Sequence, residues 1–299
     1  VFLYPAVAGV PGAWIPIDIE SEYSRDMNPT GMGETLLIKS YSTGTVFRVQ
    51  ECLKHSLAET WLDARMDQVF QICDELIKNA IKSNYKFLLI WIATRERIME
   101  KHPDLSQAEI NDWLAEAFFS GEDTVIEKHL EKLPDRRQIA REVRLLLDQE
   151  NSLLKRIWHV PSSREATAAY QQAASDPSLN PLVQIKDMSN DFEVHVHFRI
   201  ERSEDEVIIT VSNDSPILDE DLQRIHQVRN RFKNYRNEGR QEDFFAENLD
   251  TSGGGHGLGY AVMDSILYDM HLDPEISLYL ISASRTMVLL VLPLEGPRA

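Results

Sequence analysis

The hydrophobic pattern changes period late in the chain, and this change limits the fold more than any other feature of the sequence. From about residue 46 to residue 85, apolar residues recur every three or four positions, as on one face of an amphipathic helix. Residues 192–200 instead alternate between apolar and polar side chains, and residues 207–211 form a second apolar run after a charged turn. Residues 276–282 and 287–293 have the pattern of a final hairpin. We therefore expect a helical part that is followed by the strands of a sheet.

The charge balance and the cysteine count exclude several classes of protein. The 299 residues include 48 acidic and 31 basic residues, which gives a formal net charge of −17. Such a charge repels the phosphates of nucleic acids and anionic lipids, so we expect no nucleic-acid partner. The two cysteines, Cys52 and Cys73, are too few for a disulfide framework or a Cys-rich zinc site. The longest apolar run, residues 87–93, is far shorter than the ~20 residues of a membrane span, and the expected location is the cytoplasm.

The composition predicts an arm and a helical insertion. Residues 1–45 are rich in proline and glycine and lack a helical period, which predicts either an extended N-terminal arm that lies on the domain or a partly ordered lead-in. The helical insertion is expected at residues 88–185. Within it, Ser106 and Glu109 have the spacing of a capping box, which would open a helix that continues to Phe119. Further helices are expected at residues 124–133, 134–158 and 166–174.

A polar stripe interrupts the apolar pattern of the first helical region. At ~100° per residue, Glu75, Asn79 and Lys82 fall within a sector about 60° wide, while apolar residues occupy the other side. A carboxylate can activate a nucleophile, an amide oxygen can bind Mg²⁺, and an ammonium group can bind phosphate. A stripe of this kind is also the ordinary solvent-facing edge of an amphipathic helix, so the pattern leaves both interpretations open.

A second polar segment follows the strand at residues 207–211. Asn213 and Asp214 come first, and Ser215, Pro216 and Ile217 follow. Polar side chains at the C-terminal end of a strand are well placed to hydrogen-bond a ligand base. The same residue types are the usual turn formers, and by themselves they favour a plain turn.

Glycines dominate the third segment, residues 253–259, where they hold five of the seven positions directly before the apolar helical run 260–267. Glycines let backbone N–H groups approach anionic oxygens closely, and a helix N-terminus adds a partial positive charge. The segment is not a Walker A loop, because no Lys-Ser or Lys-Thr pair follows it, and its spacing is not the Rossmann pattern. A flexible linker is the alternative interpretation.

The order of these three segments resembles that of the GHKL ATPase superfamily. This superfamily includes sensor histidine kinases, the ATPase domains of type II topoisomerases, heat-shock chaperones, mismatch-repair ATPases and anti-sigma-factor serine kinases. Residues 74–82 resemble its N box, residues 211–217 its G1 box and residues 253–259 its G2 box. Thr286, before the last apolar run, resembles a threonine that the family places near the nucleotide.

The resemblance covers about residues 46–90 and 185–295, and it implies a fold. That fold is an α/β (α+β) two-layer sandwich, the Bergerat-type ATP-binding fold, in which a mixed sheet carries helices on one face. Residues 46–87 and 186–299 would form the ATP-binding domain, and residues 88–185 the helical insertion.

The resemblance also implies ATP and Mg²⁺ as ligands and a role for each site residue. Glu75 would be the catalytic carboxylate, and Asn79 would be the Mg²⁺ ligand. The family's G1 box has an aspartate that accepts a hydrogen bond from the adenine amino group, whereas this chain has Asn213, whose side-chain oxygen can accept the same bond. The further residues expected at the nucleotide are Lys82, Asp214, Ile217, Gly253, Gly255, Gly257, Leu258, Gly259 and Thr286.

Residues 221–252 stand where the family has its ATP lid. They include six cations in an otherwise acidic chain: Arg224, Arg229, Arg231, Lys233, Arg236 and Arg240. These side chains could close on a triphosphate, or they could pair with lid acids such as Glu238, Glu242 and Asp243. Phe244 and Phe245 would pin the lid to the rest of the domain.

The expected function is that of an ATP-binding signalling protein with a histidine kinase-like domain. It would transfer a phosphoryl group to a protein acceptor or hydrolyse ATP slowly. The usual self-phosphorylating layout is not supported, because His55, the one histidine before the N box, lacks the motif that follows a phosphoacceptor. The alternative is a non-catalytic regulator with a degenerate nucleotide site. A protein partner or a homodimer contact is expected through the insertion.

Overall fold

The computed structural model describes residues 33–39, 41–119, 136–157, 176, 179–217, 219–248, 258–282 and 285–296. The strands are β1 (Gly33–Ile38), β2 (Val196–Arg202), β3 (Glu206–Asn213), β4 (Leu278–Ser282) and β5 (Thr286–Pro293). The helices are α1 (Thr43–Leu57), the short 3₁₀ helix η1 (Asp63–Arg65), α2 (Met66–Lys101), α3 (Gln107–Phe119), α5 (Arg136–Ile157), α7 (Asn180–Asp191), α8 (Asp219–Asn237), α9 (Gln241–Asn248), α10 (Leu258–Asp269) and α11 (Pro274–Ser277).

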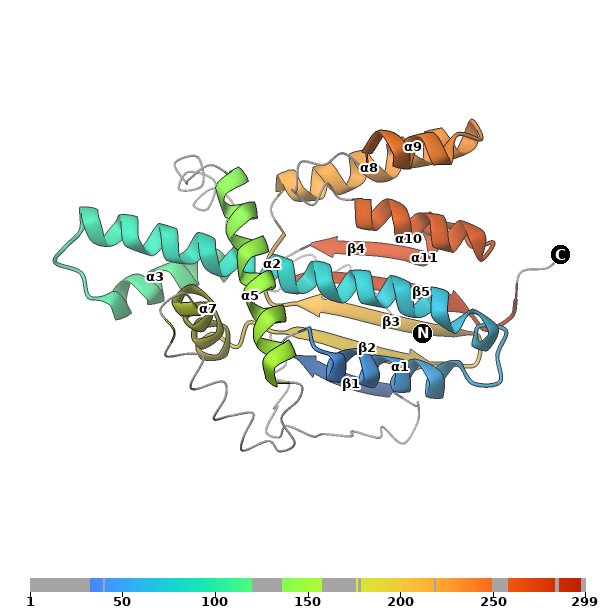
Figure 1. Ribbon diagram of the computed structural model, residues 1–299, viewed down its shortest axis with the longest axis horizontal. Coiled ribbons are helices and arrows are strands. Elements are labelled where there is room, and N and C mark those ends of the chain that lie inside the picture. Colours follow the sequence, from blue (N-terminus) through green and yellow to red (C-terminus); the bar gives the residue numbers. More distant parts are fainter. Residues whose placement is uncertain are drawn as a thin grey trace, which may run out of the picture.

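One five-stranded sheet, in the order β1-β2-β3-β5-β4, forms the centre of the molecule (Figure 1). The predicted strand pair in the 190s and 200s and the predicted C-terminal hairpin are both confirmed, as β2–β3 and β4–β5. The sheet was expected to be mixed, but every strand pair among the described residues is antiparallel. Two hairpins account for two of these pairs, since adjacent strands that a short turn joins must run antiparallel.

Strand β1 corrects the prediction of an extended arm over residues 1–45. Gly33–Ile38 pairs along β2, and Ile38 is buried beneath α1. The alternation of a half-buried strand is hidden in the sequence here, because Leu36, Leu37 and Ile38 are three apolar residues in a row while only Leu37 is exposed. Residues 1–32 lie outside the described part of the chain.

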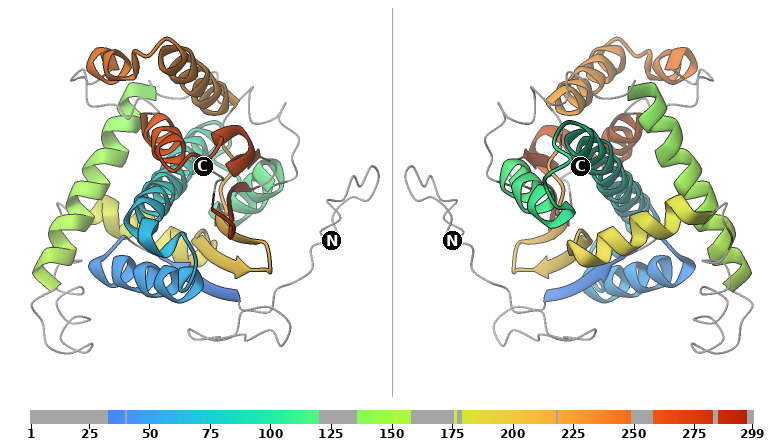
Figure 2. Two further views of the ribbon diagram at one scale, coloured as in Figure 1. Left: turned by 90° about the vertical axis from the view of Figure 1, so that its right-hand side faces the viewer. Right: turned by 90° about the vertical axis from the view of Figure 1, so that its left-hand side faces the viewer.

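Helices cover one face of the sheet, which makes the protein a member of the α+β class (Figure 2). In β3, Val207, Ile209 and Val211 are fully buried on this face, and the residues between them are half-buried. Helix α2 packs on β2 and β3, α1 packs on β1 and β2, and α10 packs beside α2. The predicted two-residue period is thus satisfied by one covered face and one open face.

Helix α2 extends through the predicted boundary between the ATP-binding domain and the insertion. It runs for 36 residues, so residues 87 and 88 lie inside one continuous helix. The apolar face persists beyond this point, since Leu88, Ile90 and Trp91 are buried against the same core as the sheet. The helical region expected at residues 46–85 therefore forms two helices, α1 and α2, of which the second continues into the insertion.

The described part of the insertion packs on α2. The capping box is confirmed: the N–H of Ser106 donates to Oε2 of Glu109 at 2.8 Å, and the N–H of Glu109 donates to Oγ of Ser106 at 3.3 Å. Helices α5 and α7 both contact α2. The carboxylate of Glu150 on α5 is buried, accepts a hydrogen bond of 2.6 Å from the Tyr85 hydroxyl and pairs with Lys186 on α7. The helices predicted at residues 124–133 and 166–174 lie outside the described residues.

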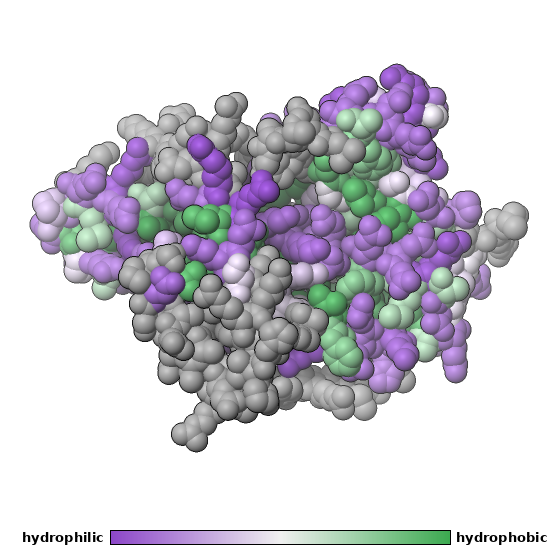
Figure 3. All heavy atoms as spheres, in the orientation of Figure 1, coloured by the Kyte–Doolittle hydropathy of each residue, from purple (hydrophilic) through white to green (hydrophobic). Residues whose placement is uncertain are grey.

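None of the described helices combines the length and the apolar character that crossing a membrane requires. Figure 3 shows hydrophilic side chains over most of the described surface on the helical side, with an apolar area near α10.

Candidate functional site

The polar stripe of α2 meets the first turn of α10. A Cβ atom built on Gly259 would lie 3.1 Å from Nδ2 of Asn79 and 3.1 Å from Oε1 of Glu75. These distances are shorter than most Cβ contacts, so a side chain at position 259 would require Asn79 and Glu75 to shift by a few tenths of an ångström. The structure therefore brings the predicted N box and the end of the predicted G2 box together, although 180 residues separate Asn79 from Gly259 in the sequence.

The first turn of α10 is a favourable place for an anion. Helix N-termini present backbone N–H groups without helical partners and a partial positive charge. Leu258 is the first residue of α10, and its side chain packs with Phe232 and Phe244. Gly253, Gly255 and Gly257, the remaining predicted phosphate-binding glycines, lie outside the described residues.

The predicted G1 box forms a buried hydrogen-bond network against α2. Nδ2 of Asn213 donates to Oδ1 of Asn84 at 3.3 Å and to Oγ of Ser215 at 2.6 Å. Oγ of Ser215 in turn donates to Oδ1 of Asn84 at 2.9 Å. The hydroxyl of Thr286 donates to the backbone oxygen of Ser215 at 2.9 Å. All four side chains are buried, so the structure joins the predicted Asn213 and Thr286 through Ser215.

Asp214 belongs to the other side of the sheet. Its Oδ2 accepts from the backbone N–H of His195 at 3.2 Å and lies 3.0 Å from Nε2 of His197. Its Oδ1 lies 3.3 Å from the Arg285 guanidinium. Burial opposes ionisation of this carboxyl, but the hydrogen bond and the charge of His197, followed by the His195 N–H and Arg285, outweigh it and lower the pKa of Asp214. The side chains of Asp214 and Asn213 therefore lie on opposite sides of the sheet, and Asp214 does not join Asn213 in the predicted nucleotide site.

Two other predicted residues take ordinary positions. Ile217 packs against the main core, and Lys82 is exposed on α2. Sequence reasoning missed Lys86, whose ammonium pairs with Asp221 in the first turn of α8. The stripe itself contains the signal for Lys86, since a residue eleven positions after Glu75 returns to within about 20° of it on a helix.

The predicted lid is a pair of helices whose cations pair with acids. Arg240 binds Asp243 at 2.9 Å and Glu238 at 3.3 Å, and Arg231 binds Glu247 at 3.1 Å. The sequence left two interpretations of the lid cations open. For Arg231 and Arg240 the structure shows the second one, in which the cations pair with acids of the lid. Phe244 also packs as expected: it is buried with Phe232 and Ala261, which ties α9 to α8 and α10.

A buried ion pair fixes α8 more firmly. Nε and the terminal nitrogen Nη2 of Arg229 each lie 2.9 Å from one oxygen of Asp264 on α10. The same guanidinium donates to the backbone oxygens of Pro274 and Leu278. Burial raises the pKa of Asp264 even though Arg229 opposes this effect. The predicted lid cation Arg229 therefore serves as an anchor between α8, α10 and α11.

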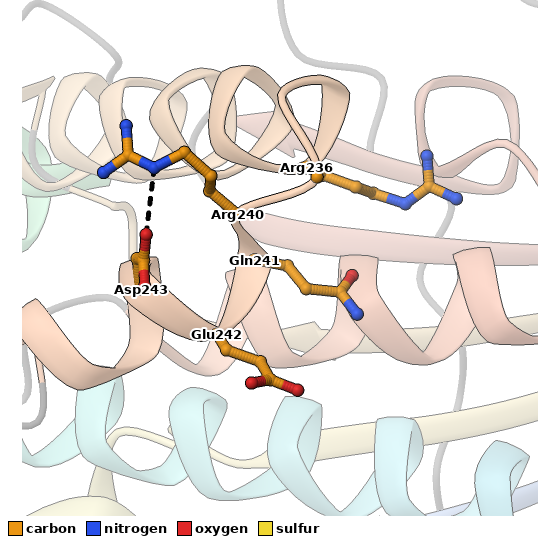
Figure 4. Close-up of a pocket in the computed structure, with 6 residues that line it drawn as sticks. Arg236, Arg240, Gln241, Glu242 and Asp243 are labelled. Atoms are coloured by element: carbon orange, nitrogen blue, oxygen red, sulfur yellow. Dashed lines mark hydrogen bonds and ion pairs between the residues drawn. The ribbon is translucent and has the colours of Figure 1, made fainter.

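A cavity of about 430 Å³ lies at the turn between α8 and α9 (Figure 4). Arg236, Gly239, Arg240, Gln241, Glu242 and Asp243 line it. Two of the predicted lid cations, Arg236 and Arg240, line this cavity, but Arg240 points toward Asp243, and no residue from the three predicted boxes lines it. The α2–α10 contact therefore remains the better candidate site.

The described residues contain no group of three or more His, Cys, Asp or Glu side chains that could hold a metal ion by itself. Comparison with known proteins found no family model, no curated protein and no solved structure that matches the chain.

Proposed function

We propose that the chain binds Mg²⁺-ATP between α2 and the first turn of α10, in a site of the GHKL type on a Bergerat-type fold. It would use the nucleotide to phosphorylate a protein acceptor or to hydrolyse it slowly. The observation that carries the proposal is the contact of Glu75 and Asn79 with Gly259. A carboxylate, an amide and a helix N-terminus meet there, which is a combination suited to Mg²⁺ and phosphate.

The residues present fit Mg²⁺ that is held together with a nucleotide. Mg²⁺ keeps several waters and takes one or two protein oxygens plus the phosphates of the substrate, so a full protein cage is not needed. Asn79 would offer its amide oxygen after the amide turns, because Nδ2 is the atom that lies toward Gly259, and the N–H groups at the start of α10 would bind phosphate. Glu75, one helical turn before Asn79, would orient or deprotonate the attacking hydroxyl group or water.

The amide of Asn79 gives a direct test of binding. In Asn79→Ala, we expect Mg²⁺-dependent ATP affinity to be lost while the fold is kept, because Asn79 lies on the half-buried edge of α2 rather than among its fully buried residues. Calorimetric titration with ATP, with and without Mg²⁺, measures this. Asn190→Ala, on an exposed position of α7, is the matched control and should bind as the parent does. Unchanged affinity in Asn79→Ala would contradict the site.

The carboxylate of Glu75 gives a test of chemistry. Removing a positioned general base typically lowers the rate by ~10²–10⁴-fold and leaves ground-state binding almost unchanged. We expect this result for Glu75→Gln in single-turnover release of the labelled γ-phosphate. Glu96→Gln changes an exposed carboxylate on the same helix and should keep the parent rate. Equal, measurable rates in the parent and in Glu75→Gln would remove Glu75 from the mechanism.

A non-catalytic regulator is the second candidate function, and the strand-end network favours it. The amide N–H groups of Asn213 bond to Asn84 and Ser215, and Arg231 of α8 and Arg240 of the turn after it pair with acids of α9. A degenerate site of this kind would bind nucleotide without turning it over, and a protein partner or a second copy would then contact the insertion. Mg²⁺-ATP binding together with zero turnover in the parent protein is the outcome that supports this candidate.

A further inference from the structure

The face of the sheet that points away from α1 and α2 is divided into a polar half and an apolar half. The half formed by β1 and β2 is mostly polar: it carries Thr35, His197, Arg199 and Glu201, and its large apolar side chain is Leu37, which is 40% exposed. The other half is apolar apart from Glu206, Thr210 and Ser212 of β3, and it has two side chains with large exposed fractions, Tyr279 (42%) and Ile281 (40%). The open-face patch, as this apolar half is called below, comprises Ile208, Tyr279, Ile281, Met287, Leu289 and Val291.

One cross-strand row connects the patch to the first residue of β1. Gly33 is paired with Glu201, Glu201 with Ile208, and Ile208 with Val291. Neighbouring strands are about 4.8 Å apart, so Val291 lies about 14 Å across the sheet from Gly33. Gly33, the first residue of β1, therefore lies in the same cross-strand row as Ile208 and Val291 of the patch.

The segment before β1 has the composition to cover such a patch. Residues 1–17 include no charged side chain, and they contain Phe2, Leu3, Trp14 and Ile15 among other apolar residues. Prolines at positions 5, 11 and 16 lack the N–H that a strand must donate to its neighbour, so this segment is poorly suited to extend the sheet at an edge. Contact through side chains on a face remains available to it.

We propose that residues 1–17 dock on the open-face patch of their own chain. The linker, residues 18–32, spans as much as ~50 Å when extended, which exceeds the distance from Gly33 to any part of the patch. Contiguous apolar patches on a protein surface often mark a contact site, and Tyr279 and Ile281 are the exposed members of such a patch. A second copy is the weaker occupant, because each copy carries a net charge of −17 and two copies repel one another.

A photo-crosslinking experiment on the full chain tests the proposal. Tyr279→p-benzoylphenylalanine places a photoreactive aromatic ring of similar shape within the patch, and Tyr279 is exposed enough to tolerate it. The matched control places the same residue at Phe47, which is 58% exposed on α1 in the helical layer. Mixing chains of normal and heavy isotope composition separates crosslinks within one chain from crosslinks between copies.

The expected result is a crosslink from position 279 to a peptide within residues 1–17 of the same chain, with none from position 47 to that peptide. A crosslink from position 279 only to a different copy would overturn the proposal in favour of a dimer. A yield at position 279 no higher than at position 47 would also overturn it, because the patch would then have no occupant. Leu289→p-benzoylphenylalanine, one strand further in, repeats the test at a half-buried position.

Discussion

Individual buried polar residues decide how the strand ends are built. One buried network joins Asn84 of α2, Asn213 at the end of β3, Ser215 in the turn after β3, and Thr286 of β5. Each of these residues forms a hydrogen bond with another member of the network inside the core. A buried polar group without a partner costs more free energy than a hydrogen bond contributes, so such a network depends on every member. The network therefore joins β3 and β5 to α2.

Replacing Asn84 should expose this dependence. In Asn84→Ala, Nδ2 of Asn213 and the hydroxyl of Ser215 lose a common acceptor, so we expect the free energy of unfolding to fall by ~1–3 kcal/mol. Denaturant unfolding with an unchanged m-value measures the loss. Asn190→Ala, an exposed asparagine, should remain within about 0.5 kcal/mol of the parent. A similar small change in both variants would show that the network contributes nothing.

His195 should make stability depend on pH. Its side chain is buried, and burial, followed by the nearby charge of Lys39, lowers its pKa although Asp214 opposes the shift; His197 also lowers it. The unfolded chain, in which histidine has a pKa of about 6.5, therefore binds a proton at a higher pH than the folded chain does. Stability is then complete above pH ~6.5 and falls as the pH drops below that value.

The variant His195→Gln should show a weaker loss of stability between pH ~6.5 and pH ~5 than the parent does. The comparison is of slopes, so a general loss of stability in the variant does not affect it. Asp214 titrates in a separate window, since its lowered pKa predicts a loss only below pH ~4. Denaturant unfolding across this pH range is the measurement, and parallel profiles would exclude His195 as the source.

At the scale of elements, helix α8 is positioned by one buried ion pair. Side-chain exposure is 16% for Arg229 and 5% for Asp264, and the guanidinium also binds two backbone oxygens. Because burial raises the pKa of Asp264 despite its partner, the pair is more important for orientation than for net stability. The second cluster, Phe232, Phe244 and Ala261, supplies apolar contacts between the same helices.

Breaking the pair on one side should be costly. We expect Arg229→Met to lower the free energy of unfolding by about 3–5 kcal/mol, because it leaves a buried carboxylate without its cation. Adding Asp264→Asn should restore part of the loss, since the unpaired charge is then removed. Lys233 is also on α8, and its exposed ion pair is with Glu275 of α11. Lys233→Met removes this pair and should change the free energy of unfolding little. Equal losses of unfolding free energy in Arg229→Met and Lys233→Met would show that the buried pair contributes no more to stability than the exposed pair.

At the scale of the whole molecule, the insertion and the sheet share one hydrophobic core. Leu114 of α3, Leu146 of α5 and Leu182 of α7 belong to the same buried cluster as Val207 and Leu290 of the sheet. Helix α2 supplies the common surface, since it contacts the sheet and all three of these helices. The two predicted domains are therefore joined by packing as well as by sequence.

This continuity predicts a single thermal transition. An insertion with a core of its own would unfold separately and give two peaks in scanning calorimetry, whereas a shared core gives one peak whose calorimetric and van't Hoff enthalpies agree. Leu146→Ala, a core truncation within α5, should lower the temperature of that one transition by weakening the common core. A second peak, or a shift confined to part of the heat absorption, would contradict a shared core.

The sequence alone determined the features that depend on neighbouring residues. The Ser106–Glu109 capping box, the alternation in β2, the returning strand β3 and the C-terminal hairpin were all predicted, because each depends on interactions within a few positions. The stripe that contains Glu75 and Asn79 was also visible from helical spacing. Only the tertiary structure showed that this stripe meets Gly259, that Asn213 and Asp214 face opposite sides of one sheet, and that Arg229 binds Asp264 rather than facing α2. These contacts join residues that are far apart in the chain, and they depend on how helices and strands pack, which no local pattern encodes.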